Sequence, residues 1–369
     1  MAQIAIDARK YFDFGIGTYI QNLSRALSDL DSRHRYSLLV SVEDSPRVEC
    51  PPNWTKQIVN FKKYSPGELM LLGYRTRKQG ADLLHIPHYT LPIGLKGRSV
   101  VTVHDLIHVK FPWCFTLPQR MYAHAVLSHV ARHAGAIITG SEHAKVDVVD
   151  TLHVDERKVY PIYHGIQPGF ERLRDEQKII DFKRRFQLRN PFVLYVGNIK
   201  PHKNIPTLLQ AFKSIVSWRK DVELVFVGEL LSNDEPLSIL AQSLGITKNI
   251  RNLGRLSKDD LICSYNAAEV LVLPSLYEGF GFTAVEAMAC ETPVVASNAA
   301  SLPEVIADAG IIFEAASPNA LENALRSVLV DARLRNELVA KGKKNIQRFS
   351  WDRAARETLR VYETVLEKR

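Results

Sequence analysis

Short runs of β-branched and aliphatic residues alternate with amphipathic stretches along most of this chain. Such alternation is typical of α/β proteins, in which helices connect the strands of a parallel sheet. A first series of runs predicts strands at Gln3–Ala8, Tyr36–Val42, Lys56–Val59, Leu83–Ile86, Ser99–Val103, Ala136–Thr139 and Val159–Pro161. A second series predicts strands at Phe192–Val196, Glu223–Val227, Ile250–Leu253, Val270–Leu273, Val294–Ala296 and Gly310–Phe313. Helical patterns between the first strands include Thr18–Leu30, Arg120–His133 and Glu142–Leu152. We therefore expect doubly wound sheets covered by helices.

The restart of the strand series at Phe192 indicates a second domain, and 369 residues suit two domains of about 150 residues or more. A polar segment that begins at Gln167 looks like the linker, with the boundary within residues 170–190. We expect an N-terminal Rossmann-like domain over residues 1–175, a C-terminal Rossmann-like domain over 176–349, and a helix over 350–369, capped by Ser350, that packs back on the N-terminal domain. Two such domains facing each other would hold a ligand in the cleft between them.

Composition narrows the classes of protein to which the chain can belong. A hydrophobic fraction of 46% with 24% charged residues suits a globular protein with substantial cores. No apolar stretch approaches the roughly 20 residues of a membrane-spanning helix, and the N-terminus reads as a strand rather than a signal peptide. The four cysteines are scattered, with no CxxC pair and no metal-ligand spacing. Reduced thiols and a cytoplasmic location are the simplest interpretation.

The net charge of +8, from 48 basic and 40 acidic residues, is compatible with nucleic acid, anionic lipid or a phosphorylated ligand. The chain has no RNP-like motif, zinc-finger spacing or basic run, so nucleic acid is not an expected partner. The segments Tyr74–Lys78 and Arg120–His133 would suit the surface of an anionic membrane at the inner face of the cell membrane. A solvated basic surface without a partner, and an ordinary helix packed on its sheet, remain equally good interpretations.

The segment from Ser275 to Glu286 carries the strongest indication of a binding site. An apolar run is followed by a loop that holds Glu278, two glycines and two phenylalanines, and then by a helix that holds Glu286. The start of a helix offers free backbone amides to an anion, while carboxylates accept hydrogen bonds from hydroxyls. This combination suits a ligand with both phosphate and hydroxyls, such as a sugar nucleotide. A solvated Glu278 and a Glu286 that pairs within its own helix are the alternatives.

Three further segments follow predicted strands. Lys203 lies where a glycine-containing loop meets a helix and could neutralise a diphosphate, although a solvated lysine fits equally well. Gly15 and Gly17 precede a helix and permit close approach of a ligand, whereas a mobile turn without a ligand is the alternative. His104 ends a buried strand and could hydrogen-bond a sugar hydroxyl, although such a histidine is often structural, as we expect for His85 and His88.

Two patterns near these segments are better explained without a ligand. Ser301 with Glu304 fits a capping box. Asp29 and Asp31 match the Asp-x-Asp of metal-dependent sugar transfer, but we expect them in a polar surface turn and predict no metal site.

Together these residues resemble the retaining glycosyltransferases of family 4, which have the GT-B fold of two facing Rossmann-like domains. Glu278 and Glu286 match the family's Glu-x7-Glu motif inside its Pro-Ser-x-x-Glu-Gly-Phe-Gly pattern. The resemblance implies that Glu286 binds the ribose, Glu278 the transferred sugar, Lys203 the diphosphate, and His104 the donor sugar. Further donor-binding positions implied by it are Gly15, Gly17, Asn198, Arg255, Leu256, Gly279, Phe280, Gly281 and Phe282. Asn198 stands where many members have arginine, which would leave Lys203 as the main cation.

The resemblance implies transfer of a hexose, with retained configuration and without a metal or cofactor, in which Glu278, His104 and Lys203 act at the reacting sugar. The variant Gly-Asn-x-x-Pro-His-Lys-Asn is similar to that of bacterial mannosyltransferases of surface polysaccharide and lipopolysaccharide synthesis, which favours GDP-mannose. The expected acceptor is a glycan or a polyprenyl-diphosphate-linked glycan. Alternatives are a UDP-sugar donor for glucosyl or N-acetylglucosaminyl transfer, a non-hydrolysing nucleotide-sugar epimerase, and a binding subunit without turnover.

Overall fold

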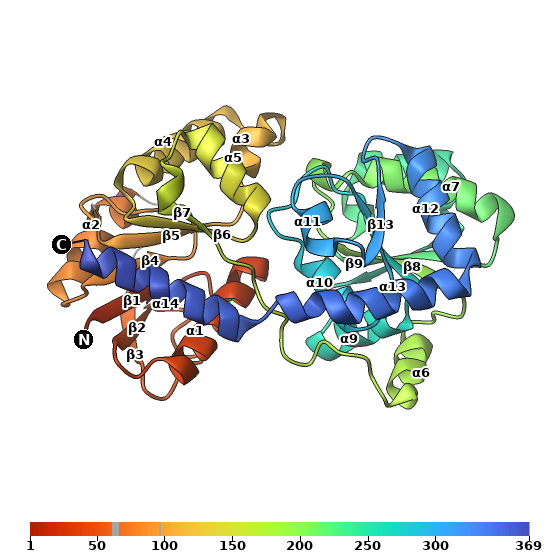
Figure 1. Cartoon of the computed structure of the whole chain (residues 1–369). Helices are drawn as coiled ribbons and strands as arrows, with labels where there is room; N and C mark the ends of the chain where they lie inside the picture. The colour runs from red at the N-terminus through yellow and green to blue at the C-terminus, as the bar shows by residue number, and fades with distance from the viewer. Residues whose placement is uncertain (61–65, 96, 369) are drawn as a thin grey trace. The chain divides into compact units, whose positions relative to one another are not determined.

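The structure is a computed structural model that describes residues 1–60, 66–95 and 97–368, and the chain forms two compact units (Figure 1). Unit 1 comprises Met1–Gly165 with Phe349–Arg369, and unit 2 comprises Ile166–Arg348. The polar segment after Gln167 lies within unit 2 because Asn266 holds it. The side-chain amide of Asn266 donates to the Glu171 carbonyl at 3.0 Å, and its oxygen accepts from the Leu173 backbone nitrogen at 2.9 Å.

Unit 1 contains, among its described residues, a seven-stranded sheet in the order β3-β2-β1-β4-β5-β6-β7. Its strands are β1 Gln3–Asp7, β2 Arg35–Ser41, β3 Thr55–Val59, β4 Leu83–Ile86, β5 Ser99–Val103, β6 Ala136–Thr139 and β7 Val159–Pro161. Every neighbouring pair in this sheet is parallel. The inner strands are apolar along nearly their whole length because helices cover both faces. The predicted strands of this half are confirmed to within one residue at each end.

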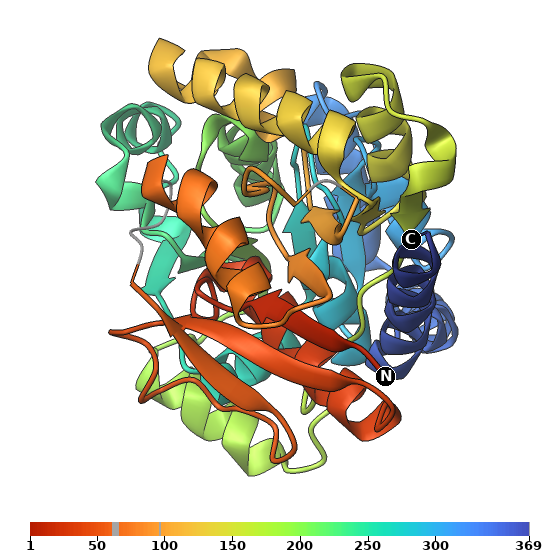
Figure 2. The ribbon, with the colours of Figure 1, turned by 90° about the vertical axis from the view of Figure 1, so that its left-hand side faces the viewer.

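Helices lie on both faces of the unit 1 sheet. They are α1 Phe14–Leu30, α2 Pro66–Lys78, α3 Ile107–Lys110, α4 Leu117–His133, α5 Glu142–Leu152 and α14 Trp351–Glu367, with short 3-10 turns η1 Pro112–Cys114 and η2 Glu156–Lys158. Leu72 of α2, Val126 of α4 and Val148 of α5 belong to one core with the strands. In Figure 2 the orange α2 and the gold α4 lie over the face of the sheet on which this core forms. The red α1 and the dark blue α14 lie together on the opposite face.

Helix α1 begins at Phe14, four residues before the start predicted from the sequence. Gly15 and Gly17 therefore lie in its first turn and not in a loop ahead of it. Because glycine is a weak helix former, the amphipathic pattern of this helix can be recognised in the sequence only from Thr18 onward. Gly17 is needed there because a Cβ would lie 2.4 Å from the carbonyl oxygen of Tyr11. The preceding loop thus packs directly on the helix backbone.

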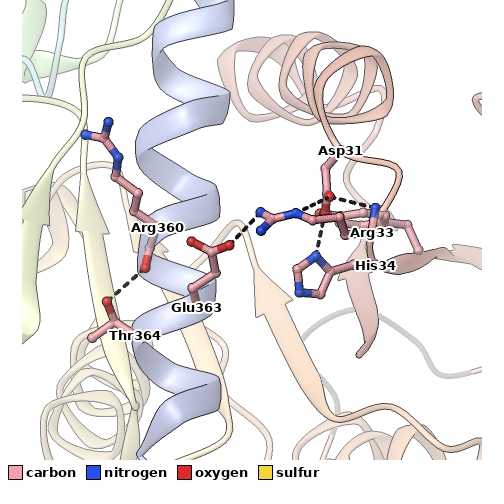
Figure 3. Close-up of polar contacts among 7 residues, drawn as sticks. Asp31, Arg33, His34, Arg360, Glu363 and Thr364 are labelled. Carbon is pink, nitrogen blue, oxygen red and sulfur yellow. Dashed lines mark hydrogen bonds and ion pairs between the residues drawn. The ribbon is translucent and has the colours of Figure 1, made fainter. Parts of the chain in front are cut away.

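Helix α14 is fixed to unit 1 by specific polar contacts. The hydroxyl of Ser350 accepts from the Arg353 backbone nitrogen, which confirms the predicted N-cap. The Tyr362 hydroxyl lies 2.6 Å from Nδ1 of His85. At the surface, Nη2 of Arg33 donates to Oε1 of Glu363 at 2.6 Å (Figure 3).

Asp31 is buried, with 3% of its surface exposed, so its predicted place in a surface turn is wrong. Its carboxylate accepts from the Tyr36 hydroxyl at 2.7 Å. It also accepts from the Arg33 backbone nitrogen at 2.9 Å and lies 2.7 Å from Nδ1 of His34 (Figure 3). All three partners lie within five residues after Asp31 in the chain. Their interactions with the carboxylate compensate the free-energy cost of removing it from water. Asp31 therefore organises the turn between α1 and β2.

Unit 2 contains, in the part of the chain described, a six-stranded parallel sheet in the order β10-β9-β8-β11-β12-β13. Its strands are β8 Phe192–Gly197, β9 Glu223–Gly228, β10 Ile250–Gly254, β11 Val270–Leu273, β12 Val294–Ser297 and β13 Gly310–Phe313. The helices are α6 Glu176–Arg185, α7 Ile205–Trp218, α8 Glu235–Ser243, α9 Lys258–Ala267, α10 Phe282–Ala289, α11 Leu302–Ile306, α12 Pro318–Val330 and α13 Ala332–Asn345, with 3-10 turns η3 Pro201–Lys203, η4 Leu231–Asn233, η5 Thr247–Asn249 and η6 Ile346–Arg348. The second predicted strand series is confirmed.

In both sheets the order of strands reverses beside the first strand of the unit, between β1 and β4 and between β8 and β11. In an open α/β sheet, the loops after the two strands that flank the reversal run to opposite faces and leave a crevice between them. Ligands of open α/β sheets bind at such a switch point. The loops after β8 and β11 are therefore the first place to look for a site in unit 2.

Candidate functional site

Lys203 and Glu278 meet at the switch point of unit 2. Lys203 ends the short turn η3 after β8, and Glu278 lies in the loop after β11. Nζ of Lys203 lies 2.5 Å from Oε1 of Glu278, and each side chain is 16% exposed. Lys203 lies just before α7, as predicted, and the two loops bring an ion pair to the carboxyl edge of the sheet.

Serine hydroxyls fix Glu278 at both its side chain and its backbone. Oγ of Ser275 donates to Oε1 of Glu278 at 2.8 Å, and Oγ of Ser301 donates to the Glu278 carbonyl at 2.9 Å. Oγ of Ser297 donates in turn to the Ser275 carbonyl. The predicted capping box at Ser301 is therefore wrong, because its hydroxyl turns to the neighbouring loop and makes no cap bond to α11. Ser297 ends β12, and Ser275 and Ser301 lie in the loops after β11 and β12, so the ends of these strands determine where Glu278 lies.

The loop that carries Lys203 is hydrogen-bonded to the segments that follow β11 and β13. Asn204 adopts a left-handed conformation with φ of 56°, and its amide donates to the Pro274 carbonyl at 3.1 Å and to the Ala315 carbonyl at 2.8 Å. The backbone nitrogen of Leu276 donates to the His202 carbonyl at 2.7 Å. The lysine and the glutamate are thus held by loops that hydrogen-bond to each other.

Glu286, the second acid of the motif, is buried at 7% exposure on α10. Its Oε2 accepts from the Tyr265 hydroxyl of α9 at 2.9 Å. Burial raises the pKa of Glu286 to about 7, against smaller lowering effects of the Tyr265 hydroxyl and the Lys258 charge. This carboxyl group titrates near neutral pH and faces α9, so pairing within its own helix does not explain it.

The start of α10 lies between the two acids. Gly281 immediately precedes the helix in the left-handed conformation, with φ of 93°, which a residue with a side chain adopts only under strain. The rings of Phe280 and Phe282 pack edge to face with centroids 5.2 Å apart, and Phe280 is buried. The first turn of α10 thus directly follows the loop of Glu278, and the start of a helix is a suitable place for binding an anion.

The remaining predicted residues of unit 2 lie at the same carboxyl edge of the sheet. Asn198 shapes its own loop, because its Oδ1 accepts from the Lys200 backbone nitrogen at 3.3 Å and its carbonyl accepts from the Tyr195 hydroxyl. Arg255, which is exposed, and Leu256, which is half-buried, follow the end of β10. Since β9 separates β10 from β8, this pair lies two strands away from the loop of Lys203.

The unit 1 candidates lie at the carboxyl edge of its sheet. His104 follows β5, and its Nε2 lies 3.1 Å from the Pro87 carbonyl. Burial lowers the pKa of His104, which keeps the ring neutral at pH 7. His85 is fully buried between the Thr102 hydroxyl, 2.8 Å from its Nε2, and Tyr362, which confirms its structural role.

Sequence reasoning missed a buried ion pair at the unit 1 switch point. Nε of Arg9 donates to Oδ1 of Asp7 at 2.8 Å, and Nη2 donates to Oδ2. Lys10, His88 and other residues line a small cavity beside the pair. The alternation of the chain located β1 but gave no sign that the polar residues at its end pair with each other. For the same reason the sequence did not reveal the contacts of Ser301 with Glu278, of Tyr265 with Glu286, or of Ser297 with the Ser275 carbonyl, which form only in the folded chain.

Two negative observations concern the part of the chain that the structure describes. Within it, no group of three or more His, Cys, Asp or Glu side chains is arranged to hold a metal ion. None of its helices combines the length and the apolar character that crossing a membrane requires.

Comparison with known proteins identifies related chains. A family model described as "Glycosyl transferases group 1" matches residues 176–345, and one described as "Glycosyltransferase Family 4" matches residues 15–170. O-antigen chain mannosyltransferase B of Escherichia coli is 29% identical over 97% of this chain and 98% of its own length. A D-inositol 3-phosphate glycosyltransferase of Salinispora tropica is 30% identical over 96% of this chain and 82% of its own length.

Among solved structures, HepE of Anabaena in complex with UDP and glucose matches with a TM-score of 0.77 at 17% identity. The match covers 98% of this chain and 99% of that one. At this identity the likeness shows the fold, and it confirms the GT-B class with its pair of Rossmann-like domains.

Proposed function

Since the chain belongs to the group 1 and family 4 glycosyltransferases, we propose that it moves a mannosyl residue from GDP-mannose to a glycan acceptor, with retention of configuration and without a metal. The observation that carries the proposal is the Lys203–Glu278 pair beside the start of α10 at the unit 2 switch point. It joins a cation, an acid and helix-start amides at the place where α/β sheets bind phosphorylated ligands.

Residues in this arrangement would suit each part of the donor: the diphosphate, the transferred sugar, the ribose and the base. Lys203 and the amides from Gly279 to Phe282 would bind the diphosphate, with Asn198 as a further neutral donor. Glu278, held by the serines, would accept hydrogen bonds from the hydroxyls of the transferred sugar. Glu286 would accept from the ribose hydroxyls, and Arg255 and Leu256 would flank the base.

Charge development supports the assignment of the catalytic groups. When the bond from the anomeric carbon to the diphosphate breaks, its electron pair passes to the phosphate oxygen and positive charge develops on the sugar. Lys203 and the helix-start amides would stabilise the leaving group, and a preorganised donor of this kind contributes about 100-fold or more to the rate. The acceptor hydroxyl would attack from the same face and give its proton to the departing phosphate oxygen. His104, with Gly15 and Gly17 at the start of α1, would contact the donor from unit 1.

The choice of mannose rests on two observations. The segment from Gly197 to Asn204 has the Gly-Asn-x-x-Pro-His-Lys-Asn form, and the Escherichia coli relative is named a mannosyltransferase of the O-antigen chain. A UDP-sugar donor is the second candidate, favoured by the complex of HepE with UDP and glucose. The product would belong to a surface polysaccharide or lipopolysaccharide.

A polyprenyl-diphosphate-linked acceptor would bring the enzyme to the cytoplasmic face of the cell membrane. On unit 1, Met70 and Tyr74 of α2 are 65% and 66% exposed, and Met121 of α4 is 65% exposed. The last turn of α2 carries Arg75, Arg77 and Lys78. Apolar side chains beside basic ones suit the interface of an anionic bilayer. Co-sedimentation with anionic but not with zwitterionic vesicles would support this contact, and equal recovery with both would refute it.

The test of the function is a binding and turnover series. A thermal-shift screen of GDP, UDP and ADP with their sugars identifies the donor, because a ligand that binds only the folded chain raises the melting temperature. With that donor, Glu278→Ala should abolish release of the sugar to water or to a glycan acceptor, and Lys203→Ala should weaken binding of the nucleoside diphosphate. Normal turnover in the first variant, or unchanged affinity in the second, would refute the assigned roles.

A further inference from the structure

The lysine proposed to bind the diphosphate already has an anionic partner from its own chain. Nζ of Lys203 is 2.5 Å from Oε1 of Glu278, and the side chains of both are 84% removed from solvent, given their exposure of 16%. A pair in this environment is screened less than one at the surface. Any phosphate that approaches Lys203 therefore competes with Glu278.

Glu278 cannot easily turn away when a phosphate arrives. Ser275 donates to the same carboxylate oxygen at 2.8 Å, and Ser301 donates to the Glu278 carbonyl at 2.9 Å. Since both serines are buried, the carboxylate stays at this edge of the sheet. When Lys203 turns to a phosphate, Glu278 needs new hydrogen-bond donors, because an uncompensated carboxylate out of water is costly.

A nucleoside diphosphate and a nucleotide sugar differ in what they offer Glu278. The nucleotide sugar brings sugar hydroxyls to the carboxylate and a diphosphate to the lysine, so both halves of the ion pair are satisfied. The nucleoside diphosphate offers a diphosphate to the lysine but no sugar hydroxyls to the carboxylate. We infer that Glu278 is a specificity-determining residue, which competes with the nucleoside diphosphate for Lys203 and so favours the sugar-bearing donor over the spent product. This inference rests on the proposed function.

The inference predicts that one substitution strengthens the binding of GDP without strengthening the binding of GDP-mannose. Glu278→Gln keeps a side chain of the same shape that can still accept from Ser275, but it removes the charge that holds Lys203. GDP should bind this variant about five- to tenfold more tightly than the wild type, as expected when a partly buried ion pair no longer has to be broken. GDP-mannose should bind more weakly or unchanged, so the preference for donor over product falls. Isothermal titration calorimetry measures both, with UDP and UDP-glucose titrated in parallel.

A matched control separates the ion pair from a general change of charge. Glu314 follows β13 at the same edge of the sheet, is exposed, and accepts from the Asn298 amide at 2.7 Å. Glu314→Gln makes the same change in net charge without touching Lys203, and it should leave both affinities as in the wild type. Circular dichroism and melting temperature establish that each variant is folded.

The outcomes distinguish this inference from the proposed function. If Lys203→Ala weakens GDP binding but Glu278→Gln leaves it equal to or weaker than the wild type, the competition is refuted and the phosphate site stands. Tighter binding of GDP to Glu278→Gln and Glu314→Gln alike would also overturn it. If none of the four nucleotides binds the wild type, or Lys203→Ala has no effect, the proposed function fails together with the inference.

Discussion

The proposed binding of the ribose by the buried carboxyl group of Glu286 predicts that donor binding depends on pH. Its pKa of about 7 in the free protein, raised mainly by burial, means that it is largely protonated at pH 5.5 and ionised at pH 8. Ribose hydroxyls bind best to the ionised form, so the donor should return the pKa toward the ordinary value of 4.5. Linkage then predicts that a nucleotide sugar binds about 30-fold more weakly at pH 5.5 than at pH 8, which is about 2 kcal/mol, and that binding at pH 6 releases about 0.9 proton.

Calorimetric titration in two buffers of different ionisation enthalpy measures both the affinity and the proton release. The phosphates of a nucleotide sugar are diesters and keep their charge over this range, so they do not obscure the effect. Glu286→Gln should bind weakly at every pH and release no proton, whereas Tyr265→Phe removes a hydrogen bond that lowers the pKa and should move the pH midpoint upward. Equal affinity of the wild type at pH 5.5 and 8 would refute the reasoning.

The raised pKa of Glu286 also makes folding stability depend on pH. Rising pH is expected to strengthen donor binding but to lower the free energy of unfolding. A carboxyl group whose pKa is raised binds its proton more tightly in the folded than in the unfolded chain. The free energy of unfolding without donor therefore falls as pH rises from about 4.5 through about 7, by about 3 kcal/mol in total. Glu286→Gln should accordingly melt at a higher temperature than the wild type at pH 8, and a lower one would contradict the burial cost.

Three further substitutions test the local arguments. Gly17→Ala should lower the melting temperature, by about 2 kcal/mol of stability or more, because its Cβ would lie 2.4 Å from a loop carbonyl oxygen; an unchanged denaturation curve would contradict this. Tyr362→Phe removes the hydroxyl 2.6 Å from a buried ring nitrogen of His85 and should cost about 1–3 kcal/mol in urea unfolding, whereas an unaltered midpoint would show that the bond contributes little. Ser275→Ala frees the Glu278 side chain and should lower kcat more than it raises KM; Ser275→Thr, which keeps the hydroxyl, should recover part of the rate, and equal loss in both variants would indicate a packing role instead.

The strands could be predicted because their burial is visible in the sequence. A strand covered by helices on both faces, such as Val270–Leu273, is a continuous apolar run that ends where the chain turns polar. The places of Glu278 and Glu286 in the fold could be predicted equally well. A strand, a glycine-containing loop and a helix follow one another in the sequence and fix where each glutamate lies along the chain. The resemblance to family 4 glycosyltransferases depended on this local spacing.

Partners brought together by the tertiary fold could not be predicted. Ser301 matched a capping pattern, but its hydroxyl donates to the Glu278 carbonyl, 23 residues away in the chain. Asp31 occupies a polar segment that reads as a surface turn, yet its carboxylate is buried with Tyr36 and the backbone of Arg33. Such residues are the commonest turn and cap formers, so their local signal is the same whether the side chain meets water or another loop.

Both sheets place an ion pair at their switch point, but only the one in unit 2 is suited to exchanging partners. Arg9 holds Asp7 through two nitrogens, and the residues are 2% and 7% exposed. Breaking a buried pair of this kind costs about 3–5 kcal/mol, because each charge is left without a partner. Lys203 meets Glu278 through a single ammonium group at 16% exposure, and the glutamate keeps a hydrogen bond from Ser275 when the lysine turns away. Under the proposed function an incoming diphosphate would replace a partner of that kind, whereas the pair in unit 1 is costly to separate.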